Sequence, residues 1–250
     1  LPLDVLMVFS ANPEDYTARG KIITPLKDRI GSEIRTHYPI TRHHGMAITA
    51  QEAWLEGRAD GGPPIEVPEF VREVVEEIAF QARQDSKVDK RSGVSQRLPI
   101  SLIENVVSNA ERRAISGGET TVVPRITDVY AALPAITGKF ELEYEGGLGG
   151  AGKVAREIIR GAVGNVFGGY FAGADLRQVI EWFDLGGTLH IDDTLRASEL
   201  LERTAQVQGL RELASYAGVR ADATVPAVAS AVDFILEGLY AQKKITRSDE

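Results

Sequence analysis

Three polar residues of this chain have side chains suited to the hydrolysis of a nucleoside triphosphate. Asn12 directly follows an apolar run, and an amide at the end of a buried strand can hold the attacking water without carrying charge. Arg29 lies two residues before Gly31, where a guanidinium could reach a phosphate bound by a neighbouring subunit. Arg97 precedes Pro99 at the start of an amphipathic segment and could reach a γ-phosphate. Asn12 and Arg29 are therefore candidate catalytic residues, and Arg97 is a candidate nucleotide-binding residue.

Each of these residues also has an ordinary structural interpretation. Asn12 begins an Asn-Pro pair, which commonly ends a strand in a turn. Arg29 could pair with Asp28 or Glu33 on the surface, and Arg97 could be a solvated member of the basic loop that precedes it. The functional interpretation therefore depends on how the three residues are combined along the chain.

The segments around the first two residues predict a small α/β region. Residues 3–9 form a continuous apolar run rich in Val and Leu, as expected for a strand buried on both faces. Residues 25–30 suit a short helix, and residues 32–38 alternate enough for a second strand. Thr41 could cap the helix that follows. The glycine- and proline-rich stretch 57–68 then indicates a boundary between subdomains.

Beyond this boundary the pattern is helical. Apolar residues recur at helix spacing, and the first such segment has Glu73, Glu76 and Glu77 between them. A second amphipathic helix should end near Gly117 and Gly118. The predicted helices cover approximately residues 70–79, 98–117, 127–133, 154–167, 175–183, 193–207, 210–216 and 225–240. A short exposed strand or extended arm is predicted for residues 139–145.

The order of these motifs resembles that of the AAA+ ATPases. The chain reads strand-Asn-Pro-Glu, then Pro-Leu-x-Asp-Arg-x-Gly, then a strand and lid helices with Ser-Gln-Arg-Leu-Pro-Ile. Over residues 3–115 it looks most like the ATPase subunit of magnesium chelatase and its MoxR-like relatives. In that family Asn12 matches sensor 1 and Arg29 matches the arginine finger that acts across the subunit interface. Arg97 matches the sensor 2 arginine.

The resemblance implies a fold class and a division into domains. It implies an α/β fragment of an AAA+ core, containing the end of a parallel sheet, followed by an all-α lid and a C-terminal helical region. The implied domains are residues 1–60 for the C-terminal part of the core, 61–120 for the lid and 121–250 for the helical C-terminal region. The Walker A lysine loop and the Walker B acids of the family are missing from the sequence. We therefore expect the downstream part of a larger ATPase, inactive by itself.

The resemblance also implies an activity, cofactors and partners. The full-length protein would be an ATP hydrolase that couples hydrolysis, in a homo-oligomeric ring expected to be a hexamer, to remodelling of a partner protein. ATP and Mg²⁺ would be bound mainly by the missing N-terminal part. The family further implies a partner that bears an integrin-like metal-binding domain. Metal insertion is one task compatible with the family, and another subunit would perform it.

Two other segments have the residue types of a binding site. The stretch Gly147–Val154 nearly matches a P-loop, G-x-x-x-x-G-K-[ST], before a predicted helix. However, Val154 replaces the hydroxyl that would bind magnesium, and an acidic segment precedes the stretch where a P-loop needs an apolar strand. We expect a loop that leads into a helix. The adjacent His43 and His44, in a chain without cysteine, do not predict a metal site.

Composition narrows the function further. The net charge of −8 argues against a nucleic-acid-binding module, which normally has a basic face. No apolar run approaches the roughly 20 residues that cross a bilayer. With no cysteine, these features fit a cytoplasmic protein without a membrane partner. Two alternative functions remain open: a non-enzymatic helical interaction scaffold, and a transcriptional activator ATPase of the sigma-54 type, which the acidic charge disfavours.

Overall fold

The computed structural model of this chain describes residues 4–10, 25, 28–55, 62–143, 150–220 and 222–247. The chain forms two compact units, Leu1–Tyr38 and Pro39–Glu250, and each is described here by itself. Of the described residues, 56% are helical and 2% are in strand positions, and none belongs to a sheet. The second unit is therefore a helical domain.

The predicted α/β fold class is wrong. Residues 4–10 and 32–38 include the two predicted strands, but neither segment forms a strand. The side chains of Val5, Leu6 and Phe9 are 64%, 92% and 61% exposed. A strand is stable only when its amides and carbonyls pair with a neighbouring strand, and the described part of the chain offers these segments no such neighbour. The described residues thus contain no end of a parallel sheet.

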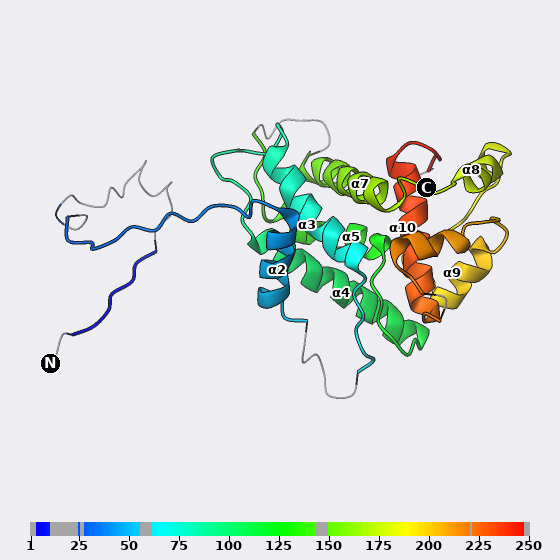
Figure 1. Ribbon diagram of the computed structural model, residues 1–250, viewed down its shortest axis with the longest axis horizontal. Helices are drawn as coiled ribbons and strands as arrows, with labels where there is room; N and C mark the ends of the chain where they lie inside the picture. The colour runs from blue at the N-terminus through cyan, green and yellow to red at the C-terminus, as the bar shows by residue number, and fades with distance from the viewer. Residues whose placement is uncertain are drawn as a thin grey trace. The chain divides into compact units, whose positions relative to one another are not determined.

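Three helices at the start of the second unit surround the candidate site. α2 (Arg42–Glu52) begins where the sequence predicts, at Thr41, whose hydroxyl accepts a hydrogen bond from a first-turn amide. α3 (Glu69–Gln84) and α4 (Arg97–Gly117) each bury an apolar face. α4 ends as predicted, because Gly118 adopts the left-handed conformation with φ 67° that few other residues tolerate. α3 packs against both α2 and α4 (Figure 1).

The centre of the hydrophobic core lies where α3 meets α7 (Gly150–Tyr170) and α10 (Val225–Ala241). The ring of Phe234 on α10 stacks on Phe70 of α3 at 4.5 Å between ring centroids. The same ring meets Phe167 of α7 edge to face at 5.9 Å. α10 is buried along almost its whole length, and it packs against α7 (Figure 1). These contacts join helices that are far apart in sequence into one core.

Short helices complete the second unit. They are α5 (Ile126–Ala131), α6 (Leu133–Thr137), α8 (Arg177–Asp184), α9 (Ala197–Thr204) and the 3-10 helix η2 (Glu212–Ala217). α9 packs against α10. The predicted strand at 139–145 is reduced in the described chain to one bridge, between Leu142 and Val88. No helix in the described ranges is both long and apolar enough to cross a bilayer.

Candidate functional site

Two of the three predicted site residues lie in the described part of the chain. Asn12 lies outside it, so its role stays a prediction. Arg29 is exposed in the first unit, and its guanidinium donates a hydrogen bond to the carbonyl of Pro25 at 3.0 Å. Glu33, one of the surface partners considered for Arg29, pairs instead with Arg35. The arginine is therefore presented on the surface of its own unit.

Arg97 is the first residue of α4, in the second unit, and its side chain is exposed. Its backbone amide donates to the Ser95 hydroxyl at 3.3 Å. Among the residues that the structure describes, its guanidinium has no hydrogen-bond or ion-pair partner. Because a guanidinium stays charged at all ordinary pH values, this one is available to an anion from outside the described chain.

Gln96, the residue before α4, is held by the two neighbouring helices. Its Nε2 lies 2.8 Å from Oε1 of Glu76 on α3. The same nitrogen lies 3.2 Å from the Thr49 hydroxyl and 3.3 Å from the Gly45 carbonyl, both on α2. Its Oε1 accepts a hydrogen bond from Arg83 at 2.9 Å. We call Gly45, Thr49, Glu76 and Gln96 the Gln96 cluster, which joins α2, α3 and the start of α4.

Glu76 is the buried carboxylate of this cluster, with 0% of its surface exposed. Its second oxygen accepts a hydrogen bond from the Thr49 hydroxyl at 2.9 Å, and no cation of the described chain forms an ion pair with it. Burial raises the pKa of Glu76, against the opposing effects of the hydrogen bonds from Gln96 and Thr49 and the charge of Arg83. Burying a charge that only neutral donors satisfy is costly. Glu76 is therefore a candidate for a role beyond stability.

The close contact between α2 and α3 depends on Gly45. A Cβ atom at this position would lie 2.0 Å from Oε1 of Glu76. Since that oxygen is already held by Gln96, the glutamate has little freedom to move away. Gly45 is thus required to bring the α2 backbone within hydrogen-bonding reach of the cluster.

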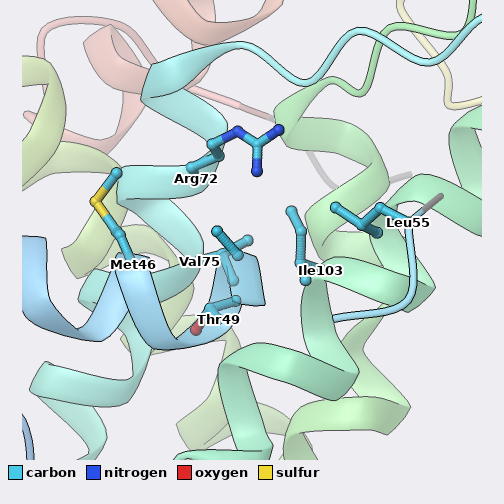
Figure 2. A pocket seen from close by; sticks show the side chains of 7 residues that line it. Met46, Thr49, Leu55, Arg72, Val75 and Ile103 are labelled. Carbon is cyan, nitrogen blue, oxygen red and sulfur yellow. The ribbon is translucent and has the colours of Figure 1, made fainter. Parts of the chain in front are cut away.

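A small cavity lies beside the cluster, between α2, α3 and α4 (Figure 2). Its volume is about 10 Å³, which is room for roughly one water molecule. In Figure 2 the Arg72 guanidinium lies above the side chains of Val75 and Ile103, and Leu55 lies to the right. The lining residues are Met46, Thr49, Ala50, Leu55, Arg72, Val75 and Ile103. The space is too small for a ligand, so this interface is a packed joint between helices.

A second polar cluster joins α2 and α3 to α7. Arg42 pairs with Glu73 at 2.7 Å and with Glu77 at 3.2 Å. Asn165 donates to Glu77 at 2.6 Å, and the Tyr170 hydroxyl donates to Glu73 at 2.8 Å. Of these residues, Arg42, Glu73, Asn165 and Tyr170 line an open groove of about 560 Å³. Because both carboxylates already have charged and neutral partners, we interpret the cluster as a connection between helices.

The two adjacent histidines, for which the sequence predicts no metal site, follow Arg42 of this groove in the chain. His43 and His44 are both exposed on α2. Across the described ranges, no group of three or more His, Asp or Glu residues is arranged to hold a metal ion.

A buried ionic network at the ends of α4 and α5 was not predicted from the sequence. Arg113 donates to Asp128 at 2.8 Å and lies 3.4 Å from Glu119. Burial lowers the pKa of Arg125 and raises the pKa of Asp128. The Asp128 carboxylate also accepts a hydrogen bond from the Arg125 backbone amide. The side chains of Arg113 and Asp128 are only 2% and 3% exposed, so a ligand cannot reach them. The network is structural.

The P-loop-like stretch is described only in part. Gly147 to Gly149 lie outside the described residues, and α7 begins at Gly150, as the prediction of a following helix requires. Lys153 is exposed in the first turn of α7. The expectation that the stretch is a loop and not a phosphate site stays a prediction.

Comparison with protein-family models, curated proteins and solved structures finds no match to this chain. The functional assignment therefore rests on its own residues. Among them, Arg97 has an exposed guanidinium without a partner in the described chain, and the preceding residue, the half-buried Gln96, is hydrogen-bonded to α2 and α3.

Proposed function

We propose that this chain is the lid-forming and arginine-bearing part of an AAA+ ATPase. In this proposal the protein works as a ring of identical subunits and uses ATP hydrolysis to remodel a partner protein. The order of the Asn-Pro-Glu, Asp-Arg-x-Gly and Ser-Gln-Arg motifs supports it. The position of Arg97 supports it most directly. An exposed guanidinium at the start of a helix, with no anionic partner in the described chain, is suited to phosphate oxygens.

The proposal gives each arginine a separate task. Arg97 would contact the nucleotide of its own subunit, and Arg29, exposed on the first unit, would reach the nucleotide of a neighbour. Both would neutralise the negative charge that builds up during phosphoryl transfer. Mg²⁺ and the phosphate cradle are assigned to residues outside this sequence, because the Walker A and Walker B motifs of the family are not found in it.

ATP hydrolysis by the complete polypeptide that contains this chain tests the proposal. Arg29→Ala should lower turnover by about 10³-fold or more, with nucleotide binding near that of the wild type. Arg35→Ala is the matched control, since Arg35 is exposed six residues away and pairs with Glu33. Arg97→Ala should weaken the response of the lid to nucleotide, whereas Arg112→Ala, also exposed on α4, should not. Normal turnover by Arg29→Ala would contradict the assignment of the finger.

A helical interaction scaffold is the second candidate. The observation that favours it is the absence of any sheet among the described residues, because an ATPase core of this family needs one. The two candidates differ in one measurement. If the complete protein neither binds nor hydrolyses ATP, the ATPase proposal is refuted and the scaffold is the candidate that remains.

A further inference from the structure

We infer that Gln96 is a positioning residue that couples Arg97 to helix α2, so that contact between Arg97 and a nucleotide stabilises α2. The nucleotide contact rests on the proposed function. The coupling itself follows from the contacts of the Gln96 cluster.

The first step is the link between Arg97 and Gln96. They are consecutive in the chain, so a movement of Arg97 displaces the backbone of Gln96. Arg83 fixes the turn before them, because its Nε donates to the Val94 carbonyl at 3.0 Å and a terminal nitrogen donates to Gln96 Oε1 at 2.9 Å. The first turn of α4 is therefore held against the end of α3, with the Arg97 side chain on the outside.

The second step is the orientation of the Gln96 amide. Glu76 accepts a hydrogen bond from Nε2, and Arg83 donates one to Oε1. If the amide were reversed, its oxygen would face the carboxylate of Glu76, and its NH₂ group would face a guanidinium. Both contacts would be repulsive. Glu76 and Arg83 thus keep the NH₂ group directed at α2. This role explains why Glu76 is buried although it forms no ion pair with a described residue.

The third step is the dependence of α2 on this amide. α2 spans only Arg42–Glu52, and a helix of this length is marginal unless tertiary contacts support it. Only Gly45 and Thr49 of α2 are buried, and these are the two α2 residues that Gln96 contacts. Two other polar links join α2 to α3: the Thr49 hydroxyl donates to Glu76, and Arg42, the first residue of α2, pairs with Glu73 and Glu77. A shift of Gln96 therefore changes the stability of the middle of α2.

Hydrogen exchange measured by mass spectrometry on the complete polypeptide tests this coupling. Exchange is followed with and without Mg²⁺ and ATPγS in peptides that cover residues 42–52 and 94–100. In the wild type, nucleotide should protect both segments. In Gln96→Met, protection of 94–100 should remain, and the nucleotide-dependent protection of 42–52 should fall about fivefold, as expected for the loss of one hydrogen bond.

Two further variants separate coupling from general loss of stability. Gln81→Met is the matched control, because Gln81 lies on α3 and donates to Glu77 at 3.2 Å, away from Gln96. It should retain the nucleotide-dependent protection of both segments. Arg97→Ala changes only an exposed side chain, so it should fold normally, yet it should abolish the protection of 42–52 while Gln96 is intact.

The outcomes distinguish the coupling from the proposed function. If nucleotide protects neither segment in the wild type, no nucleotide reaches this chain, and both proposals are refuted. If nucleotide protects 94–100 and either Gln96→Met or Arg97→Ala leaves the protection of 42–52 unchanged, only the coupling is refuted. An equal loss of that protection in Gln81→Met would also refute it, because the effect would then be a general one.

Discussion

Glu76→Gln should change the free energy of unfolding relative to the wild type in a pH-dependent way. The difference should favour the variant more at neutral and alkaline pH than at acidic pH. The substitution removes the charge but keeps the size of the side chain. In the wild type, the two carboxylate oxygens accept hydrogen bonds from Gln96 at 2.8 Å and Thr49 at 2.9 Å, both neutral donors. An amide can keep a hydrogen bond with each partner while avoiding the cost of burying a charge.

The size and sign of the effect follow from the pKa of Glu76, which burial raises above the value of 4.5 for an unperturbed glutamate. A carboxyl whose pKa is higher in the folded state stabilises folding fully below the unfolded pKa. This contribution is lost as the pH rises through the folded pKa. The Gln variant has no such loss. Its advantage in free energy of unfolding should therefore grow above pH 4.5, by at most about 1.4 kcal/mol per pH unit, and become constant above the raised pKa.

Urea denaturation at a series of pH values from about 4.5 to 8 measures this difference, because a linear extrapolation at each pH gives the free energy of unfolding. Glu202→Gln is the matched control, since Glu202 is exposed on α9. Its difference from the wild type should change little over the same range.

A difference that stays flat or shrinks as the pH rises would refute the reasoning for Glu76. It would mean that the charge of Arg83 and the two hydrogen bonds outweigh burial, so that the buried carboxylate is held ionised without cost. The orientation of Gln96 would then need a different explanation.

Three other substitutions test the packing of the helical unit. Gly238→Ala should destabilise the protein by about 1–3 kcal/mol, because the new Cβ would lie 2.1 Å from the ring of Phe167; a neutral effect in thermal melting would contradict this close approach. Gly169→Ala, at a helical position with no atom within 4 Å of the new Cβ, should instead stabilise by about 0.5–1 kcal/mol in the same assay. Arg113→Leu should cost about 3–5 kcal/mol in urea denaturation, because it leaves Asp128 buried beside an apolar side chain; a cost below about 1 kcal/mol would show that the pair does not hold the ends of α4 and α5 together.

The helices were predictable where a local rule decides them. Thr41 supplies a side-chain cap to α2, and Gly118 supplies the left-handed residue that ends α4. Both are properties of a few neighbouring residues, which is why the sequence alone reveals them. The strands predicted at 3–9 and 32–38 depend instead on a partner strand, which no local pattern can specify.

The candidate site was predictable in part for a similar reason. Arg97 stands out because the residues around it form a motif. Glu76 does not, because it follows the polar spacing of an amphipathic helix that would place it on an exposed face. The structure buries it because α3 is in contact with α2 and α4 as well as α7, and helical periodicity shows only one buried face.

The burial of α10 has a consequence for how this protein is made. α10 lies at the centre of the core. Its Asp233 accepts a hydrogen bond from the Thr127 amide, and its Ser230 donates one to the Pro124 carbonyl; each partner lies 106 positions earlier, near the start of α5. On the ribosome, α7 is complete at Tyr170, but the helix that covers it is complete only at Ala241. At about 5–20 residues per second, those 71 residues take roughly 4 to 14 s to synthesise. During that interval α7 can pack on α3, which is already made, but the part of its surface that contacts α10 has no permanent cover.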